Sequence, residues 1–99
     1  MITISIMSFP PESAKEVGRR FTELAPIPNY IETNGPYLYT DERDGNTSIT
    51  IYKYEKTRAA EALDAISNLL VPFYGVPGMK YSLQLASSSK TALSMLGLG

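Results

Sequence analysis

The sequence predicts an α+β domain in which a four-stranded antiparallel sheet carries two helices on one face. Three observations carry this prediction. Apolar and polar residues alternate in four separate segments, which is the period of half-buried strands. Two segments between them have apolar residues at spacings of three and four, which is the period of amphipathic helices. The segments follow one another in the order β-α-β-β-α-β, and 99 residues make one domain of ordinary size.

The first strand is expected at residues 2–9, "ITISIMSF", where isoleucine alternates with Thr3, Ser5 and Met7. Ile2, Ile4 and Ile6 would then point to the helices. Two prolines at positions 10 and 11 end the strand and suit the start of a helix. The apolar stripe of that helix consists of Ala14, Val17, Phe21 and Leu24.

Gly18 lies on the same stripe, although glycine disfavours a helix interior. We interpret it as a point where this helix approaches the sheet closely. The outer side of the helix pairs Glu16 with Arg20 and Arg19 with Glu23, each at a spacing of four residues.

A hairpin is expected next, with one strand over residues 29–40, bent at 34–36 by Gly35-Pro36, and another over 47–54. Asp44-Gly45 is a strong two-residue turn signal. With these two residues at the centre of the turn, Leu38 pairs with Ile51 and Tyr37 with Tyr52. Since paired residues share a face, all the tyrosines of the hairpin would lie on the face away from the helices.

The second helix has a stripe that consists of Ala59, Leu63, Ile66, Leu70 and Phe73. The last strand, residues 79–86, would turn Tyr81, Leu83 and Leu85 toward the helices. The domain is expected to span residues 1–88. The tail, residues 89–99, is expected to form a short helix from about Lys90 to Gly97, packed on its own or on a neighbouring subunit.

The order β-α-β-β-α-β is that of the ferredoxin-like split βαβ fold. Its second sheet face would be open and unusually aromatic. Tyrosine is enriched at interfaces because it joins apolar area to a polar tip. The sequence therefore predicts a dimer face or a ligand-binding surface made of Tyr37, Tyr39, Tyr52, Tyr54, Met7, Thr50 and Gln84.

Composition argues against several function classes. The chain contains no cysteine, histidine or tryptophan, so serine–histidine and cysteine–histidine catalysis are excluded and no cofactor or metal is expected. A net charge of −1 disfavours nucleic acid. No segment has the length of a membrane span or the form of a signal peptide, so a cytoplasmic location is expected. The acidic residues Asp41, Glu42 and Asp44 do not match a calcium loop and are interpreted as a solvated turn.

The strand faces and the segment "FYGVPG" before the last strand give residues 1–86 a resemblance to the dimeric α/β-barrel group of ferredoxin-like proteins. The layout is similar to that of stress-responsive α/β-barrel proteins and antibiotic-biosynthesis monooxygenases. The resemblance implies a homodimer whose sheets pack through their open faces. Haem-degrading members rely on a histidine and a tryptophan that this chain lacks, and "SFPPES" lacks the arginine of acylphosphatases.

Three hypotheses for function follow. The leading one is a homodimeric binding or structural module, with a hydrophobic small molecule as a further partner. The second is a cofactor-independent enzyme, an oxygenase or isomerase acting on a hydrophobic or aromatic substrate, with tyrosines and Glu32 as its polar groups and no catalytic set assigned. The third is a sheet that stacks RNA bases, which the shortage of basic residues disfavours.

Overall fold

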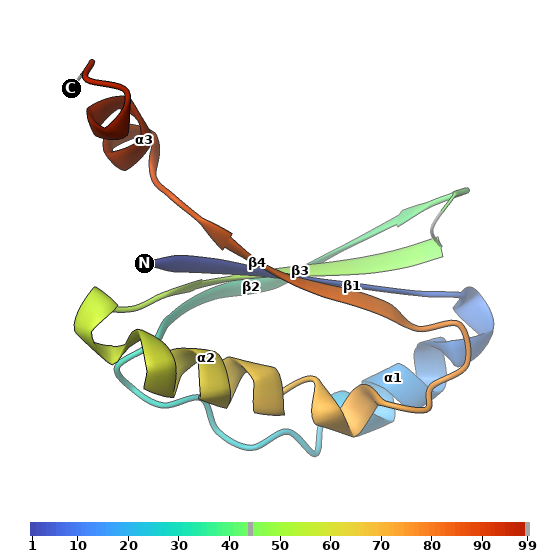
Figure 1. Cartoon of the computed structure of the whole chain (residues 1–99). Helices are drawn as coiled ribbons and strands as arrows, with labels where there is room; N and C mark the ends of the chain where they lie inside the picture. The colour runs from blue at the N-terminus through green and yellow to red at the C-terminus, as the bar shows by residue number, and fades with distance from the viewer. Residues whose placement is uncertain (44, 99) are drawn as a thin grey trace.

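Four antiparallel strands form one sheet in the order β2-β3-β1-β4 in the computed structural model of the chain (Figure 1). The structure describes residues 1–43 and 45–98. The central strands are β1 (Ile2–Phe9) and β3 (Gly45–Lys53), and the edge strands are β2 (Glu32–Asp41) and β4 (Lys80–Ala86). This order confirms the ferredoxin-like fold class, because each βαβ half contributes one central strand and one edge strand.

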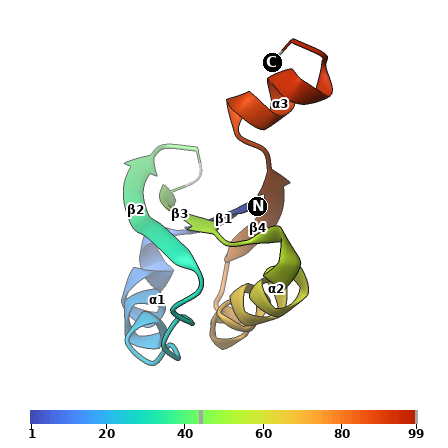
Figure 2. The same cartoon turned by 90° about the vertical axis from the view of Figure 1, so that its left-hand side faces the viewer.

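Two helices cover one face of the sheet, and a third stands on the other side (Figures 1 and 2). The covering helices are α1 (Ala14–Phe21) and α2 (Ala59–Asn68), and the third is α3 (Ser89–Met95). The tail helix is therefore confirmed. It lies beyond the end of β4 and away from α1 and α2.

The core between sheet and helices consists of two groups of buried residues. One joins the sheet to α2 and contains Ile31, Tyr52, Tyr54, Ala62 and Ile66. The other joins the end of β1 to α1 and contains Phe9, Val17, Phe73 and Val76. Phe9 and Tyr52 thus bring aromatic rings from the sheet into the core beside α1 and α2.

Polar contacts fix the position of α1. The Arg20 guanidinium donates to the Glu16 carboxylate at 2.7 Å and to the backbone carbonyl oxygens of Pro72 at 3.0 Å and Tyr74 at 2.7 Å. Arg20 therefore ties α1 to the turn that follows α2. The predicted ion pairs of Arg20 with Glu16 and of Arg19 with Glu23 are both present.

The register of the hairpin differs from the prediction. Tyr37 pairs with Ile49 and Leu38 with Ser48, and a bulge lies between Asn34 and Tyr37. Asp41 pairs with Gly45, so three residues rather than two connect the strands. Asp44, the first residue of the predicted turn pair, lies outside the described residues. The register is thus displaced by three residues at this end, and an odd displacement exchanges the faces on which side chains lie.

The prediction is also wrong about which face of the two central strands is directed toward the helices. Thr3 and Ser5 of β1, and Thr50 and Tyr52 of β3, are buried. Their neighbours in sequence, the isoleucines at 4, 6, 49 and 51, lie on the open side and are half-buried. On β4 the prediction is right, since Leu83 pairs with Ser5 and packs in the core.

The interpretation of Gly18 as a close contact with the sheet is wrong. A Cβ atom placed on Gly18 would meet nothing within 4 Å. Gly18 instead borders a cavity between α1 and the sheet. The stripe of α1 therefore leaves space beneath β2 rather than filling it.

Candidate functional site

The open face is the side of the sheet away from α1 and α2. Ile4 pairs with Ile51 and Ile6 with Ile49, and each pair points to the same side. Tyr37 pairs with Ile49 and extends this surface onto β2, where 61% of the tyrosine side chain is exposed. We use "open face" for the set Ile4, Ile6, Ile49, Ile51, Tyr37 and Tyr39. This surface is more aliphatic than the sequence prediction of an open face lined by four tyrosines.

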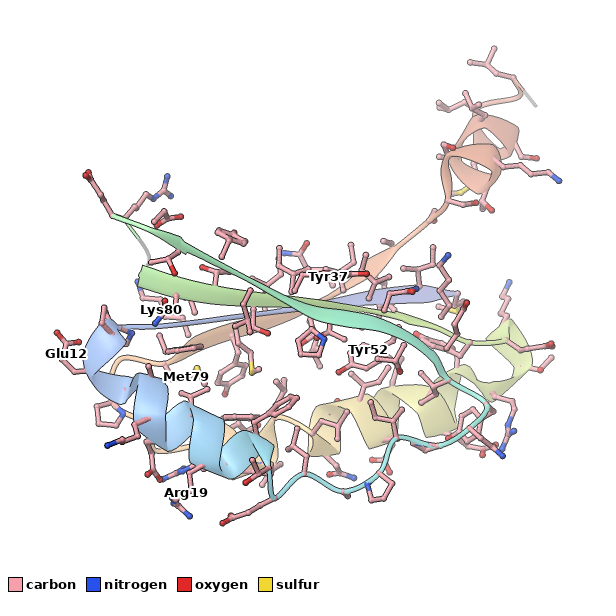
Figure 3. The ribbon with its side chains drawn as sticks, turned by 180° about the vertical axis from the view of Figure 1, so that it is seen from behind. Glu12, Arg19, Tyr37, Tyr52, Met79 and Lys80 are labelled. Carbon is pink, nitrogen blue, oxygen red and sulfur yellow. The ribbon has the colours of Figure 1, made fainter. Side chains whose placement is uncertain are left out.

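The structure divides the predicted site residues between the two faces. Tyr37 and Tyr39 belong to the open face, and Gln84 lies beside it on the same side of the sheet, where it pairs with Ile4. The prediction that Tyr52, Tyr54, Met7 and Thr50 share that face is wrong, because the register places Tyr52, Met7 and Thr50 beneath the sheet and Tyr54 is buried in the core there. Figure 3 shows Tyr37 and Tyr52 on opposite sides of the sheet. A role for the set in dimerisation or ligand binding stays a prediction.

A cleft runs beneath the sheet, between β2 and α1. It contains a cavity of about 280 Å³ beside α2 and a second of about 390 Å³ beside α1. The two cavities are neighbours, since five residues line both of them: Met7, Phe21, Pro36, Ser48 and Phe73. We call this space the cleft. Its volume is in the range of pockets that hold small molecules.

Hydroxyl groups line the sheet side of the cleft, and apolar side chains line the helix side. Ser5, Thr33, Ser48, Thr50 and Tyr52 come from the strands. The helices and the segments after them contribute Phe21, Leu24, Ile66, Leu69, Leu70 and Phe73. The cleft therefore suits a molecule with an apolar body and one or two polar atoms.

Two of these hydroxyls, those of Tyr52 and Thr33, are affected by their burial. Burial raises the pKa of Tyr52 above its ordinary value of 10, against a smaller opposing effect of a hydrogen bond with Thr50. Tyr52 therefore stays protonated at physiological pH and serves as a neutral donor. Among the described residues, Thr33 has a buried hydroxyl oxygen with no hydrogen-bond partner. A buried polar atom in this state is rare and marks a place where a partner would be favourable.

The carboxylates considered from the sequence lie elsewhere. Glu32 is exposed at the start of β2, opposite Lys53, and does not line the cleft. Glu42 of the acidic turn is also exposed. Within residues 1–43 and 45–98, no three ligand-type side chains gather as a metal site would require. None of the helices in the same residues has the length and apolarity to cross a membrane.

Sequence reasoning missed the cleft and the aliphatic character of the open face. The signal for the cleft was the run Ser48, Thr50, Tyr52, which has hydroxyls at every second position of one strand. Because isoleucine alternates with them, the sequence predicts that these hydroxyls lie on the open face, in the surface for a dimer partner or a ligand. In the structure the hydroxyls face the helices and the isoleucines face outward.

The chain exposes more surface than a compact monomer. Its accessible surface is 6704 Å², whereas a compact monomer of its mass is expected to expose about 5,600 Å². Its radius of gyration is 15.1 Å, against about 13 Å for a compact domain of this length. The excess of about 1,100 Å² is of the size that one partner contributes to a stable interface.

No protein-family model and no curated protein matches the chain. Among solved structures, it is similar to a de novo designed protein, Foldit4, at 13% identity and a TM-score of 0.40, over 87% of this chain and 96% of that one. It is also similar to a DUF3240 family protein from Shewanella baltica, at 13% identity and a TM-score of 0.32, over 89% of this chain and 97% of that one.

Proposed function

We propose that the protein is a homodimeric binding module in which two open faces pack against each other. The observation that carries the proposal is the pairing of Ile4 with Ile51 and of Ile6 with Ile49 on a side of the sheet that α1 and α2 leave uncovered. Contiguous apolar surface of this kind is rare on monomeric proteins and typical of interfaces. The arrangement would resemble the dimeric α/β-barrel group, and a cytoplasmic location stays a prediction.

Light scattering after size exclusion tests the dimer. The wild-type chain is expected at twice its mass at micromolar concentration. Ile49→Lys places a charge at the centre of the open face and is expected to give folded monomers, because a lysine there would be desolvated in the dimer. Ser67→Lys adds the same charge on the exposed side of α2 and is expected to stay dimeric. A monomeric wild type, or a dimeric Ile49→Lys, would contradict the proposal.

The cleft favours a second activity of the same module, the binding of an apolar small molecule that bears a hydrogen-bonding group. The titratable groups that line it are tyrosines, which are weak bases at neutral pH. The cleft therefore supports binding more directly than it supports an oxygenase or isomerase. An enzyme acting on a hydrophobic or aromatic substrate would use the same space.

Binding of 8-anilinonaphthalene-1-sulfonate, with decanoic acid as a competitor, tests this activity. Ser48 borders both cavities, so Ser48→Leu is expected to weaken binding of the dye at least about tenfold by filling the cleft. Ser67→Leu makes the same change on the outside of α2 and is expected to leave binding unchanged. Equal binding by both variants would place the dye elsewhere and remove the cleft as a site.

A further inference from the structure

The tail of the chain forms a helix with complete caps at both ends. At its start, the Thr91 backbone N–H donates to the Ser88 side-chain oxygen at 3.2 Å. At its end, Gly97 has a positive φ of 76°, and the Leu98 N–H donates to the Leu93 carbonyl at 2.8 Å. This Schellman geometry satisfies carbonyls that would otherwise lack donors. The sequence therefore specifies where α3 begins and ends.

The same helix exposes much of its apolar surface. At 100° per residue, Ala92, Leu93, Met95 and Leu96 form one stripe, and Lys90, Thr91 and Ser94 form the other side. Side chains on the stripe are 45% exposed at Leu93, 79% at Met95 and 72% at Leu96. No residue of α3 is buried. Helices this short are marginal in water, and most of their stability comes from packing an apolar face.

The position of the arm indicates what covers the stripe. We use "arm" for residues 87–98. It leaves the end of β4 on the side of the sheet that carries the open face, opposite α1 and α2 (Figures 1 and 2). A partner protein docked on the open face would therefore contact the arm as well.

The exposed area of the chain favours a second copy of the same chain as that partner. Strand spacing and rise give a plan area of about 500 Å² for a sheet of four strands with eight residues each. A stable interface needs about 800 Å² from each partner. The exposed stripe of the arm adds apolar area to that of the sheet, on the same side of the molecule. The chain as a whole exposes about 1,100 Å² more than a compact monomer of its mass, which is enough area for such an interface.

We propose that, in the homodimer, the arm of each subunit packs its apolar stripe against the other subunit. The inference rests on the proposed function, because it needs a second copy on the open face. The arm then acts as a clasp that adds contact area and orders α3 at the moment of association. There are two alternatives: the arm packs on its own sheet, or it binds a different protein.

Sedimentation equilibrium of three chains tests the clasp. The double variant Leu93→Glu/Leu96→Glu places two charges on the stripe and is expected to weaken the dimer at least about tenfold, because two buried leucines are lost from the interface. Ser94→Glu places one charge on the polar side of the same helix and is expected to change the dissociation constant less than threefold. A wild-type dimer that the double variant leaves equally tight would overturn the clasp and leave the dimer standing. A monomeric wild type would overturn both.

Hydrogen exchange of the arm amides distinguishes packing against a second copy from these two alternatives. Protection of residues 92–98 is expected to rise with the dimer fraction when the wild-type chain is measured above and below its dissociation constant. Equal protection at both concentrations would mean that the arm packs on its own subunit. Absence of protection in the dimer would leave the arm free for another protein. Either result overturns the clasp.

Discussion

The hydroxyl of Thr3 lies 2.7 Å from the hydroxyl of Tyr54, in the buried core beneath the sheet. Thr3 is 1% exposed and Tyr54 is 6% exposed. The bond satisfies two polar groups that the core would otherwise bury at a cost. It explains how a β1 face of threonine and serine, rather than isoleucine, can lie against the helices.

Removing the Tyr54 hydroxyl tests this bond. Tyr54→Phe keeps the ring and leaves the Thr3 hydroxyl buried without a partner, so the free energy of unfolding is expected to fall by about 1–3 kcal/mol. Tyr37→Phe, on the open face, is expected to change it by less than about 0.5 kcal/mol. Urea unfolding at equal chain concentrations measures both. Equal midpoints for the two variants would contradict the placement of Tyr54 in the core.

The two faces should respond differently to the same charge. Tyr52→Asp buries a carboxylate among Ile66 and other apolar groups and is expected to unfold the chain, since an uncompensated buried charge costs several kcal/mol. Tyr37→Asp is expected to stay folded and to associate more weakly. Circular dichroism and light scattering report the two outcomes. A folded Tyr52→Asp protein would show that Tyr52 faces outward, as the sequence alone predicts.

Two glycine substitutions are expected to act in opposite directions. Gly18 has helical backbone and free space around a Cβ atom, so Gly18→Ala is expected to stabilise the chain by about 0.5–1 kcal/mol. Gly35 has a φ of +105°, and a Cβ atom there would lie 2.8 Å from the Ile49 carbonyl oxygen. Gly35→Ala is expected to destabilise it by about 1–3 kcal/mol. Thermal unfolding decides the sign of each change, and a loss of stability in Gly18→Ala would mean that α1 does approach the sheet.

Glu16 of α1 is expected to make the stability of the fold depend on pH in the acid range. Hydrogen bonds from Arg19 and then Arg20 lower the pKa of Glu16 from 4.5 to about 2. A lowered pKa stabilises the fold above pH 4.5, and this contribution disappears as the pH falls from 4.5 to 2. Carbon-detected NMR should show the Glu16 carboxyl titrating near pH 2. Glu16→Gln should flatten the pH dependence of the unfolding midpoint in this window, and 1 M salt should reduce it. A Glu16 pKa near 4.5 in the folded chain would contradict the pairing.

Local patterns of the sequence were sufficient for the order of elements and for several details within them. The alternation at residues 2–9, the stripe of α2, the ion pairs of α1 and the tail helix with Gly97 at its end depend on contacts within a few residues. Such contacts repeat with the period of the backbone, so they are visible in one dimension. The fold class follows because few topologies accommodate that order.

The face that each strand turns to the helices was decided by tertiary structure. In β1 and β3 both faces are able to pack, one through isoleucines and the other through Phe9 and Tyr52, so alternation alone does not choose between them. The choice depends on which set fits the stripes of α1 and α2, and on a bond between Thr3 and Tyr54 that joins positions 51 residues apart. The sequence by itself determined that there are two faces, whereas packing against the helices decided which one forms the core and left the isoleucines outside.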